Sequence, residues 1–238
     1  MEKLELAQDP NTPAEVLAEL ARDPSVEVRQ AVAKNPSTPA AVLERLAEDE
    51  SWLVRWEVIS NSNTSREILE RLARDENAEV RRGVASKPFT PAFILERLAE
   101  DEDHGVRQAV AWNRNTPVQA LERLARDSSW YVRRVVIQNP NIPVNLLEEL
   151  AQDPHWQVRR EVVWTPSTPV YVLVGMYRDP SPGIREAVAE RLMEQLEGLP
   201  EDPALWLFLW EMTHEEGRRR IEEHPYGAHV AVLVRLGG

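Results

Sequence analysis

The chain repeats itself every 26 residues, and this period constrains its fold more than any other feature. A Thr-Pro pair marks five copies and a related pair marks two more, at Thr12-Pro13, Thr38-Pro39, Thr64-Ser65, Thr90-Pro91, Thr116-Pro117, Ile142-Pro143 and Thr168-Pro169. A leucine recurs at the same step, at Leu17, Leu43, Leu69, Leu95, Leu121, Leu147 and Leu173. A fixed period of about 20 to 50 residues indicates stacked units, because a single unit cannot bury its own apolar face.

Each copy has the pattern of two short helices. Thr12 suits the N-cap of a first helix, and Pro13 suits its first position, where a missing N–H costs nothing. A second helix follows with valines at helical spacing, and it ends at an Asn-Pro such as Asn35-Pro36, because the residue before proline avoids the α region. Its expected N-caps are Ser25, Ser51, Asn77, Asp103, Ser129 and Ser181, with His155 as a weak one. Helices this short are marginal alone, so we predict that the pairs stack into an α-solenoid.

The predicted organisation is all-α, with seven two-helix repeats over residues 12–193. The repeats start at residues 12, 38, 64, 90, 116, 142 and 168. Residues 1–11 match the end of a repeat and are expected to form an N-terminal half-repeat cap. Residues 194–238 fit no repeat, and their apolar segment 204–210 is too short to span a bilayer. We expect residues 194–238 to form a helical C-terminal cap.

Composition excludes several classes of protein. The absence of Cys excludes disulfide scaffolds, thiolate zinc sites, Cys-ligated iron–sulfur clusters and Cys nucleophiles. A formal net charge of −12 disfavours nucleic acid and anionic membranes as partners. No run of about 18 apolar residues is present, and the acidic N-terminus lacks an apolar signal region. We therefore expect a cytoplasmic protein that does not enter a membrane.

The repeat also resembles a known family. The segment VRQAVAKNPSTP at residues 28–39, followed by LERLAED at residues 43–49, resembles the leucine-rich repeat variant (LRV) family, and residues 23–29 are similar to the second-helix start of HEAT repeats. The resemblance covers residues 1 to about 192. It implies a right-handed superhelix of helices without a β-sheet. Some members use a 3₁₀ segment for one helix or carry a Cys-ligated iron–sulfur cluster, but this chain has no Cys, so no cofactor is expected.

An Asp column and an Arg column run through the repeats. Because every copy carries the same pair, we interpret the columns as a structural ladder rather than as a series of sites. Each Asp is expected to accept backbone N–H groups, and each Arg to bridge to the Asp of its own or the next repeat. An Asn column, Asn35, Asn61, Asn113 and Asn139, is typical of turns. The ladder residues are Asp23, Arg29, Asp49, Arg55, Asp75, Arg81, Asp101, Arg107, Asp127, Arg133, Asp153, Arg159, Asp179 and Arg185.

Function is expected where the repeats differ. The first, fifth and ninth positions of each second helix lie opposite its valine face and are predicted to be exposed. In the first six repeats these eighteen positions hold six Trp, four cations including Lys34, and no acid. Exposed Trp with Arg is typical of binding hot spots. The alternative is that the rings fill grooves between neighbouring helices. The predicted partner-binding residues are Trp52, Trp56, Arg82, Trp112, Trp130, Arg134, Trp156, Arg160 and Trp164.

No catalytic or metal-binding motif is recognisable, since the five His match no ligand spacing. We therefore predict a non-enzymatic module that binds a protein or peptide with acidic or aromatic groups on a concave Trp/Arg face. One alternative is a HEAT-like solenoid enzyme that acts on nucleic acid, as a DNA glycosylase does, or on a chromophore, with Glu57 and Glu161 as the nearest candidate acids. A second alternative is a ligand-free structural or engineered scaffold.

Overall fold

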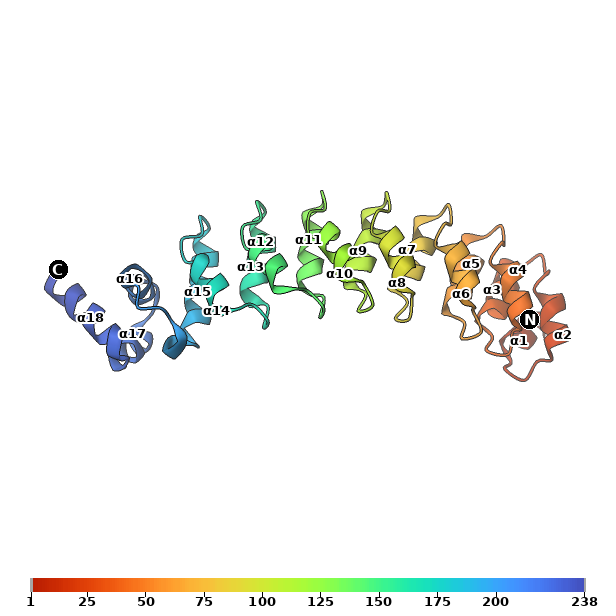
Figure 1. Cartoon of the computed structure of the whole chain (residues 1–238). Coiled ribbons are helices and arrows are strands. Elements are labelled where there is room, and N and C mark those ends of the chain that lie inside the picture. Colours follow the sequence, from red (N-terminus) through yellow and green to blue (C-terminus); the bar gives the residue numbers. More distant parts are fainter. Residues whose placement is uncertain (1, 238) are drawn as a thin grey trace. The chain divides into compact units, whose positions relative to one another are not determined.

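The computed structural model describes residues 2–237, which fall into two compact units. Unit 1 comprises the residues up to Leu124 together with Asn139–Asn141, and unit 2 comprises Ala125–Gln138 and the residues from Ile142 onward. All regular structure in residues 2–237 is helical, without a strand. Figure 1 shows the helices following one another as pairs. The predicted all-α fold is confirmed.

The helix bounds follow the 26-residue step of the sequence. The first helices of the pairs are α2 (Ala14–Leu20), α4 (Ala40–Leu46), α6 (Arg66–Leu72), α8 (Ala92–Leu98) and α10 (Val118–Leu124) in unit 1, and α12 (Val144–Leu150) and α14 (Val170–Gly175) in unit 2. The second helices are α3 (Val26–Lys34), α5 (Trp52–Ser60), α7 (Ala78–Ser86) and α9 (His104–Trp112) in unit 1, preceded by α1 (Glu2–Gln8), and α11 (Trp130–Ile137), α13 (Trp156–Trp164) and α15 (Pro182–Met193) in unit 2. Both helices of each pair are α-helical rather than 3₁₀.

The core of each unit is built by stacking. The second helices α1, α3, α5, α7 and α9 pack side by side in unit 1, as do α11, α13 and α15 in unit 2. Their valines, such as Val28 and Val32, are buried against the leucines of the first helices, such as Leu17 and Leu43. Each fully buried Val or Leu contributes about 1.5–3 kcal/mol. A seven-residue helix is unstable alone, so the stability of each pair comes from its neighbours.

The threonines do not cap the first helices, and that expectation is wrong. Helix α2 begins at Ala14 with Pro13 as its N-cap, and the hydroxyl of Thr12 instead donates to the carbonyl of Leu6, at 2.6 Å. Thr38 donates in the same way to Val32, in the last turn of the preceding helix. The carbonyls of a last turn lack the usual i+4 partner, and a threonine hydroxyl binds one of them at six of the seven joints, the exception being that of Ile142.

The C-terminal part of unit 2 consists of a 3₁₀ turn (Leu196–Gly198) and the helices α16 (Pro203–Met212), α17 (Glu215–Glu223) and α18 (Pro225–Gly237). Trp206 of α16 is fully buried and stacks on His224, with ring centroids 4.5 Å apart. Helix α16 packs on both α15 and α18. The division into half-repeat, repeats and cap stays a prediction. None of the helices in residues 2–237 has the length and apolar composition needed to cross a bilayer.

Candidate functional site

An Arg–Asp ladder fixes the second helices relative to one another within each unit. The guanidinium of Arg55 binds both carboxylate oxygens of Asp75 in the next repeat, at 2.6 and 2.8 Å, and donates to the carbonyl of Asp49 at 2.8 Å. Asp75 also accepts the backbone N–H of Asn77. The same bidentate pairing joins Arg29 to Asp49, Arg81 to Asp101, Arg133 to Asp153, and Arg159 to Asp179. In each of these five pairs, the hydrogen bond to the Asp carboxylate raises the pKa of the Arg guanidinium.

The ends of the ladder differ from its rungs. Asp23 is bound by Lys3 of α1, at 2.7 Å, in place of an Arg. The hydrogen bond from Lys3, followed by that from the Ser25 N–H, lowers the pKa of Asp23. Arg185 donates to the carbonyls of Asp179 and Pro180 and pairs with no carboxylate in the described chain.

The Asn column links repeats instead of only shaping turns. The amide of Asn61 donates to the carbonyls of Ala33 and Asn35 in the previous repeat, at 2.7 and 2.8 Å, and its oxygen accepts the N–H of Asn63. Asn35, Asn113 and Asn139 make the equivalent pair of inter-repeat bonds. The sequence pattern indicated the turn but not the hydrogen bonds between repeats, although the recurrence of Asn at the 26-residue step was a signal for them.

Lys87 occupies the Asn position of one repeat. Its ammonium donates to the carbonyl of Ile59 and lies 3.5 Å from that of Asn61. Burial lowers the pKa of Lys87. The link is therefore kept at this joint, but with a partly desolvated charge.

In unit 1 the predicted binding residues are exposed, and one of them, Trp56, also touches the neighbouring helix α7. Trp52, Trp56 and Trp112 keep 38% to 63% of their surface accessible, and Arg82 is exposed. Trp56 lies against Gly83 of α7, where an added Cβ would come within 3.0 Å of the indole nitrogen. One edge of the Trp56 ring therefore fills a groove while the rest remains accessible.

In unit 2 two of the corresponding rings, Trp130 and Trp156, stack on the ring of His155. Trp156 and Trp164 are exposed, whereas Trp130 is half-buried because its ring lies parallel to that of His155, with centroids 4.3 Å apart. The centroids of His155 and Trp156 are 6.5 Å apart. The sequence pattern did not indicate this role for His155, which N-caps α13 without a side-chain cap bond.

Carboxylates from outside the eighteen positions pair with three of the four predicted cations. Lys34 binds Glu57 at 2.9 Å. Arg82 binds Glu79 on its own helix. Arg134 lies 3.3 Å from Glu161 of the neighbouring helix α13. Lys34, Arg82 and Arg134 are therefore ion-paired, so the unpaired positive charge of this face is smaller than the four cations at the eighteen positions alone indicate. Arg160 is exposed and has no ion-pair partner in the described residues. In α15 the same positions hold the acids Glu186 and Glu190.

A small cavity of about 150 Å³ lies on this face of unit 2. It is lined by Arg134 of α11 and by Gln157, Arg160, Glu161 and Trp164 of α13. Three of these residues were predicted to bind a partner. Gln157 and Glu161 also line the cavity but were not among the predicted binding residues, although Glu161 stands where most second helices have Ala, Gly or Val.

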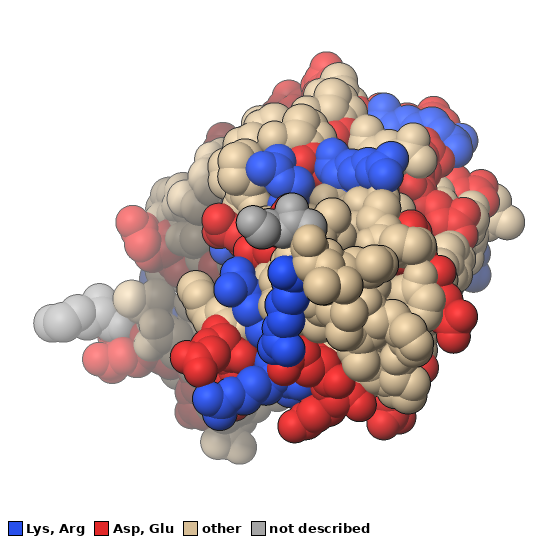
Figure 2. Space-filling view, turned by 90° about the vertical axis from the view of Figure 1, so that its left-hand side faces the viewer, with Lys and Arg blue, Asp and Glu red and all other residues tan. Residues whose placement is uncertain are grey.

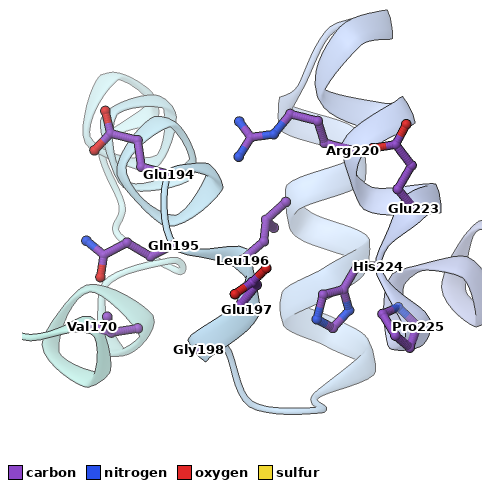
Figure 3. A pocket seen from close by; sticks show the side chains of 10 residues that line it. All are labelled: Val170, Glu194, Gln195, Leu196, Glu197, Gly198, Arg220, Glu223, His224 and Pro225. Carbon is purple, nitrogen blue, oxygen red and sulfur yellow. The ribbon is translucent and has the colours of Figure 1, made fainter.

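Larger cavities lie among the C-terminal helices of unit 2. One of about 780 Å³ is lined by Glu194, Glu197, Arg220, Glu223 and His224, among others, and Figure 3 shows Arg220 extending from α17 toward the end of α15. Arg220 donates to the carbonyl of Met193, and His224 accepts the N–H groups of Tyr226 and Gly227. The side chains of Arg220 and His224 are thus hydrogen-bonded to backbone groups of the chain itself. Residues 2–237 contain no cluster of three or more side chains suited to a metal ion.

Helix α18 contributes an exposed apolar surface. Val232, Leu233 and Leu236 are accessible, and a shallow cavity beside them is lined by Ala228 and His229. Figure 2, which views this end of unit 2, shows side chains of both charges around an area that has none. Nothing in the described residues covers this surface.

Comparison with known proteins agrees with the repeat architecture. A model described as Leucine Rich Repeat Variant domain matches residues 1–55, and a model described as Leucine rich repeat variant matches residues 78–103 and 104–129. Curated proteins give no match. Among solved structures, YibA of E. coli is 15% identical over 97% of this chain and 94% of its own, with a TM-score of 0.34. A designed armadillo repeat protein in complex with the peptide (KR)4 is 15% identical over 98% of each chain, with a TM-score of 0.21. Both scores are too low to support an argument about this chain.

One solved structure matches much better. It is described as a leucine-rich repeat variant with a novel repetitive protein structural motif. The two chains are 32% identical over 80% of each, with a TM-score of 0.65. Together with the 26-residue helix pairs and the two family models, this match shows that the chain belongs to the leucine-rich repeat variant family.

Proposed function

We propose that this repeat protein is a non-enzymatic module that binds a protein or peptide through the Trp and Arg side chains of its second helices. The observation that carries the proposal is the exposure of Trp52, Trp56, Trp112, Trp156 and Trp164. A buried Trp removes about 150–250 Å² from water, so exposing several at equivalent positions is costly for a chain without a partner. Aromatic contacts are therefore the main expected source of affinity.

Among the four cations of this face, Arg160 is the one expected to attract an acidic group of the ligand. Lys34, Arg82 and Arg134 are neutralised by neighbouring carboxylates, whereas Arg160 is not. The ligand is expected to combine aromatic or apolar groups with an acidic group that lies near Arg160, and salt should weaken its binding moderately. An overall charge of −12 disfavours duplex DNA, since few phosphates would be neutralised.

The contacts of the candidate acids favour binding over catalysis. Glu57 is buried and paired with Lys34. Glu161 is held by Arg134 and accepts a hydrogen bond from Gln138 at 2.7 Å. A general acid or base has to reach its substrate, and both carboxylates are already engaged within the fold.

Selection from a phage-displayed peptide library, followed by affinity measurement, tests the proposal. Peptides selected on the wild-type protein should bind the Trp156→Ala/Trp164→Ala variant at least about tenfold more weakly, as expected for hot-spot tryptophans. The matched control is Tyr171→Ala/Phe89→Ala, which removes two exposed aromatic rings outside the second helices. Binding to this control should be unchanged.

Two outcomes contradict the proposal. If no peptide is enriched, or if the control variant loses as much affinity as the Trp variant, the exposed rings are not a binding face. Thermal unfolding of the same proteins tests the groove-filling alternative. A loss of several kcal/mol in the Trp156→Ala/Trp164→Ala variant would mark the rings as core side chains.

A further inference from the structure

We propose that the cavity between α11 and α13 binds the carboxylate of an acidic side chain. This inference rests on the proposed function and specifies one subsite of the ligand. The cavity, of about 150 Å³, is bordered by Arg134, Gln157, Arg160, Glu161 and Trp164. The four residues of α13 share one face of that helix, because they lie three, four and seven positions apart.

The balance of charge in the cavity favours an anion. It contains two cations, Arg134 and Arg160, and one acid, Glu161. Glu161 lies 3.3 Å from Arg134 and accepts the amide of Gln138, so its charge is already balanced. The remaining formal charge is +1 and resides on Arg160.

The cavity also offers hydrogen-bond donors that the chain does not use. The guanidinium of Arg160 and the amide of Gln157 have no hydrogen-bond partner in the described residues. The Nε atom of Arg134 is shielded from solvent and lies 3.3 Å from Glu161, so the free donors of the cavity are those of Arg160 and Gln157. A carboxylate has two oxygens with about four acceptor sites and fits the fork of an Arg in bidentate fashion, so one such group could accept from both Arg160 and Gln157.

The size and walls of the cavity favour a carboxylate side chain over a phosphate. A volume near 150 Å³ holds one small side chain, and the indole of Trp164 supplies an apolar wall for its methylene groups. A phosphate near pH 7 carries close to two charges, whereas the site has one uncompensated cation. Glu161 lines the cavity, and Glu186 occupies the register position of Arg160 on the next second helix. Both acids penalise a doubly charged ligand more than a singly charged one.

An equivalent position in unit 1 shows why the second cation matters. Glu57 has the register of Glu161, and it too is paired with a cation of the preceding helix, Lys34. At the register of Arg160, however, α5 carries Trp56. The ion pair of unit 1 is therefore complete, and no anion site is expected there.

Binding can be measured directly by NMR on the side-chain Nε–Hε signals of arginine. The probes are N-acetyl-glutamate methylamide, N-acetyl-glutamine methylamide and inorganic phosphate, each titrated into the full chain at constant ionic strength. The glutamate probe should shift the signals of Arg134 and Arg160 in a saturable way. The uncharged glutamine probe should bind at least about tenfold more weakly, because it lacks the charge-assisted bonds.

Variants assign the effect to the cavity. Arg160→Gln should weaken the glutamate probe at least about tenfold, and Arg160→Lys should recover only part of the loss, since lysine lacks the bidentate fork. The matched control is Arg82→Gln, which removes an exposed Arg at the same register in α7 and should have no effect. Glu186→Gln should strengthen binding. Arg160 is exposed and without an ion-pair partner, so its substitution should leave the helical circular dichroism and the melting temperature unchanged.

Three results would overturn the inference: no shift at either Arg, equal binding of the glutamine probe, or tighter binding of phosphate than of glutamate. These results do not depend on the peptide selection. If selected peptides bind in a Trp-dependent way but ignore Arg160→Gln and the replacement of their own acidic residues by amides, the subsite is refuted while the proposed function stands. If no peptide is selected, the NMR titration still decides whether the cavity binds a carboxylate.

Discussion

Replacing Arg55 with methionine is expected to lower the stability of unit 1 by about 3–5 kcal/mol, the usual cost of breaking a buried ion pair from one side. The side chains of Arg55 and Asp75 are only 9% and 6% exposed. Arg55→Met removes both donors to the Asp75 carboxylate and leaves it with the N–H of Asn77 alone. It also frees the carbonyls of Asp49 and Glu50.

Asp75→Asn should cost less, about 1.5–3 kcal/mol, because the amide keeps an acceptor for Asn77 while the charge-assisted bond is lost. The double variant Arg55→Met/Asp75→Asn should be more stable than the sum of the two losses predicts, by about 1–3 kcal/mol, since no unpaired charge remains buried. The exposed inter-repeat pair of Arg123 and Glu100 provides the control, and Arg123→Met should cost less than about 1 kcal/mol.

Native-state hydrogen exchange of the amides in α5 and α7 is the appropriate assay, because repeat arrays can unfold locally and one midpoint then misrepresents them. A loss for Arg55→Met as small as that for Arg123→Met would refute the reasoning. It would mean that the Asp75 carboxylate finds water or another donor once the guanidinium is gone.

Three further predictions follow from single contacts. Lys87→Asn should stabilise unit 1 by about 1 kcal/mol in urea unfolding, because a neutral amide replaces a desolvated charge. It should also remove the rise in stability expected as the pH increases through the lowered pKa of Lys87 toward its ordinary value of 10.5. Lys3→Ala should raise the pKa of Asp23 toward 3.8 in an NMR titration. In the wild-type protein, the stabilisation of the fold by the Lys3–Asp23 pair is complete above that pH and is lost as the pH falls through the lowered pKa. Gly83→Ala should displace the ring of Trp56 and increase its quenching by acrylamide, which an unchanged quenching constant would contradict.

The sequence was sufficient to predict the helical repeat because the relevant signals are local. Proline before six of the seven first helices and Asn just after four of the second helices mark the helix boundaries, and Val and Leu at helical spacing mark the core. The error at Thr12 has a physical origin. A threonine before proline can cap the following helix or bond to the preceding one, and only the packed structure shows that its hydroxyl reaches the carbonyl of Leu6.

The candidate site was less predictable because its ion pairs form between side chains of neighbouring helices. The sequence pattern gives the residues opposite the valine face of each helix separately, and within its own helix Arg134 has no nearby acid. Glu161 is 27 residues away in the sequence and reaches Arg134 only because α11 and α13 pack together. The stacking of Trp130 on His155 also joins neighbouring repeats. The assignment of these residues to ligand binding stays a prediction.

The ladder gives the chain a head and a tail. Arg29, Arg55 and Arg81 each reach forward to the Asp of the following repeat, so each of these repeats presents an acceptor on one side and a donor on the other. Removing one whole period from unit 1, such as residues 64–89, would bring Arg55 opposite Asp101, and a duplicated period would find matching partners on both sides. A deletion whose length is not a multiple of 26 residues would leave a buried Arg and a buried Asp without their partners. Such a chain can therefore gain or lose repeats only in steps of 26 residues. Lys3 binds Asp23, the first Asp of the ladder, which has no preceding Arg to pair with.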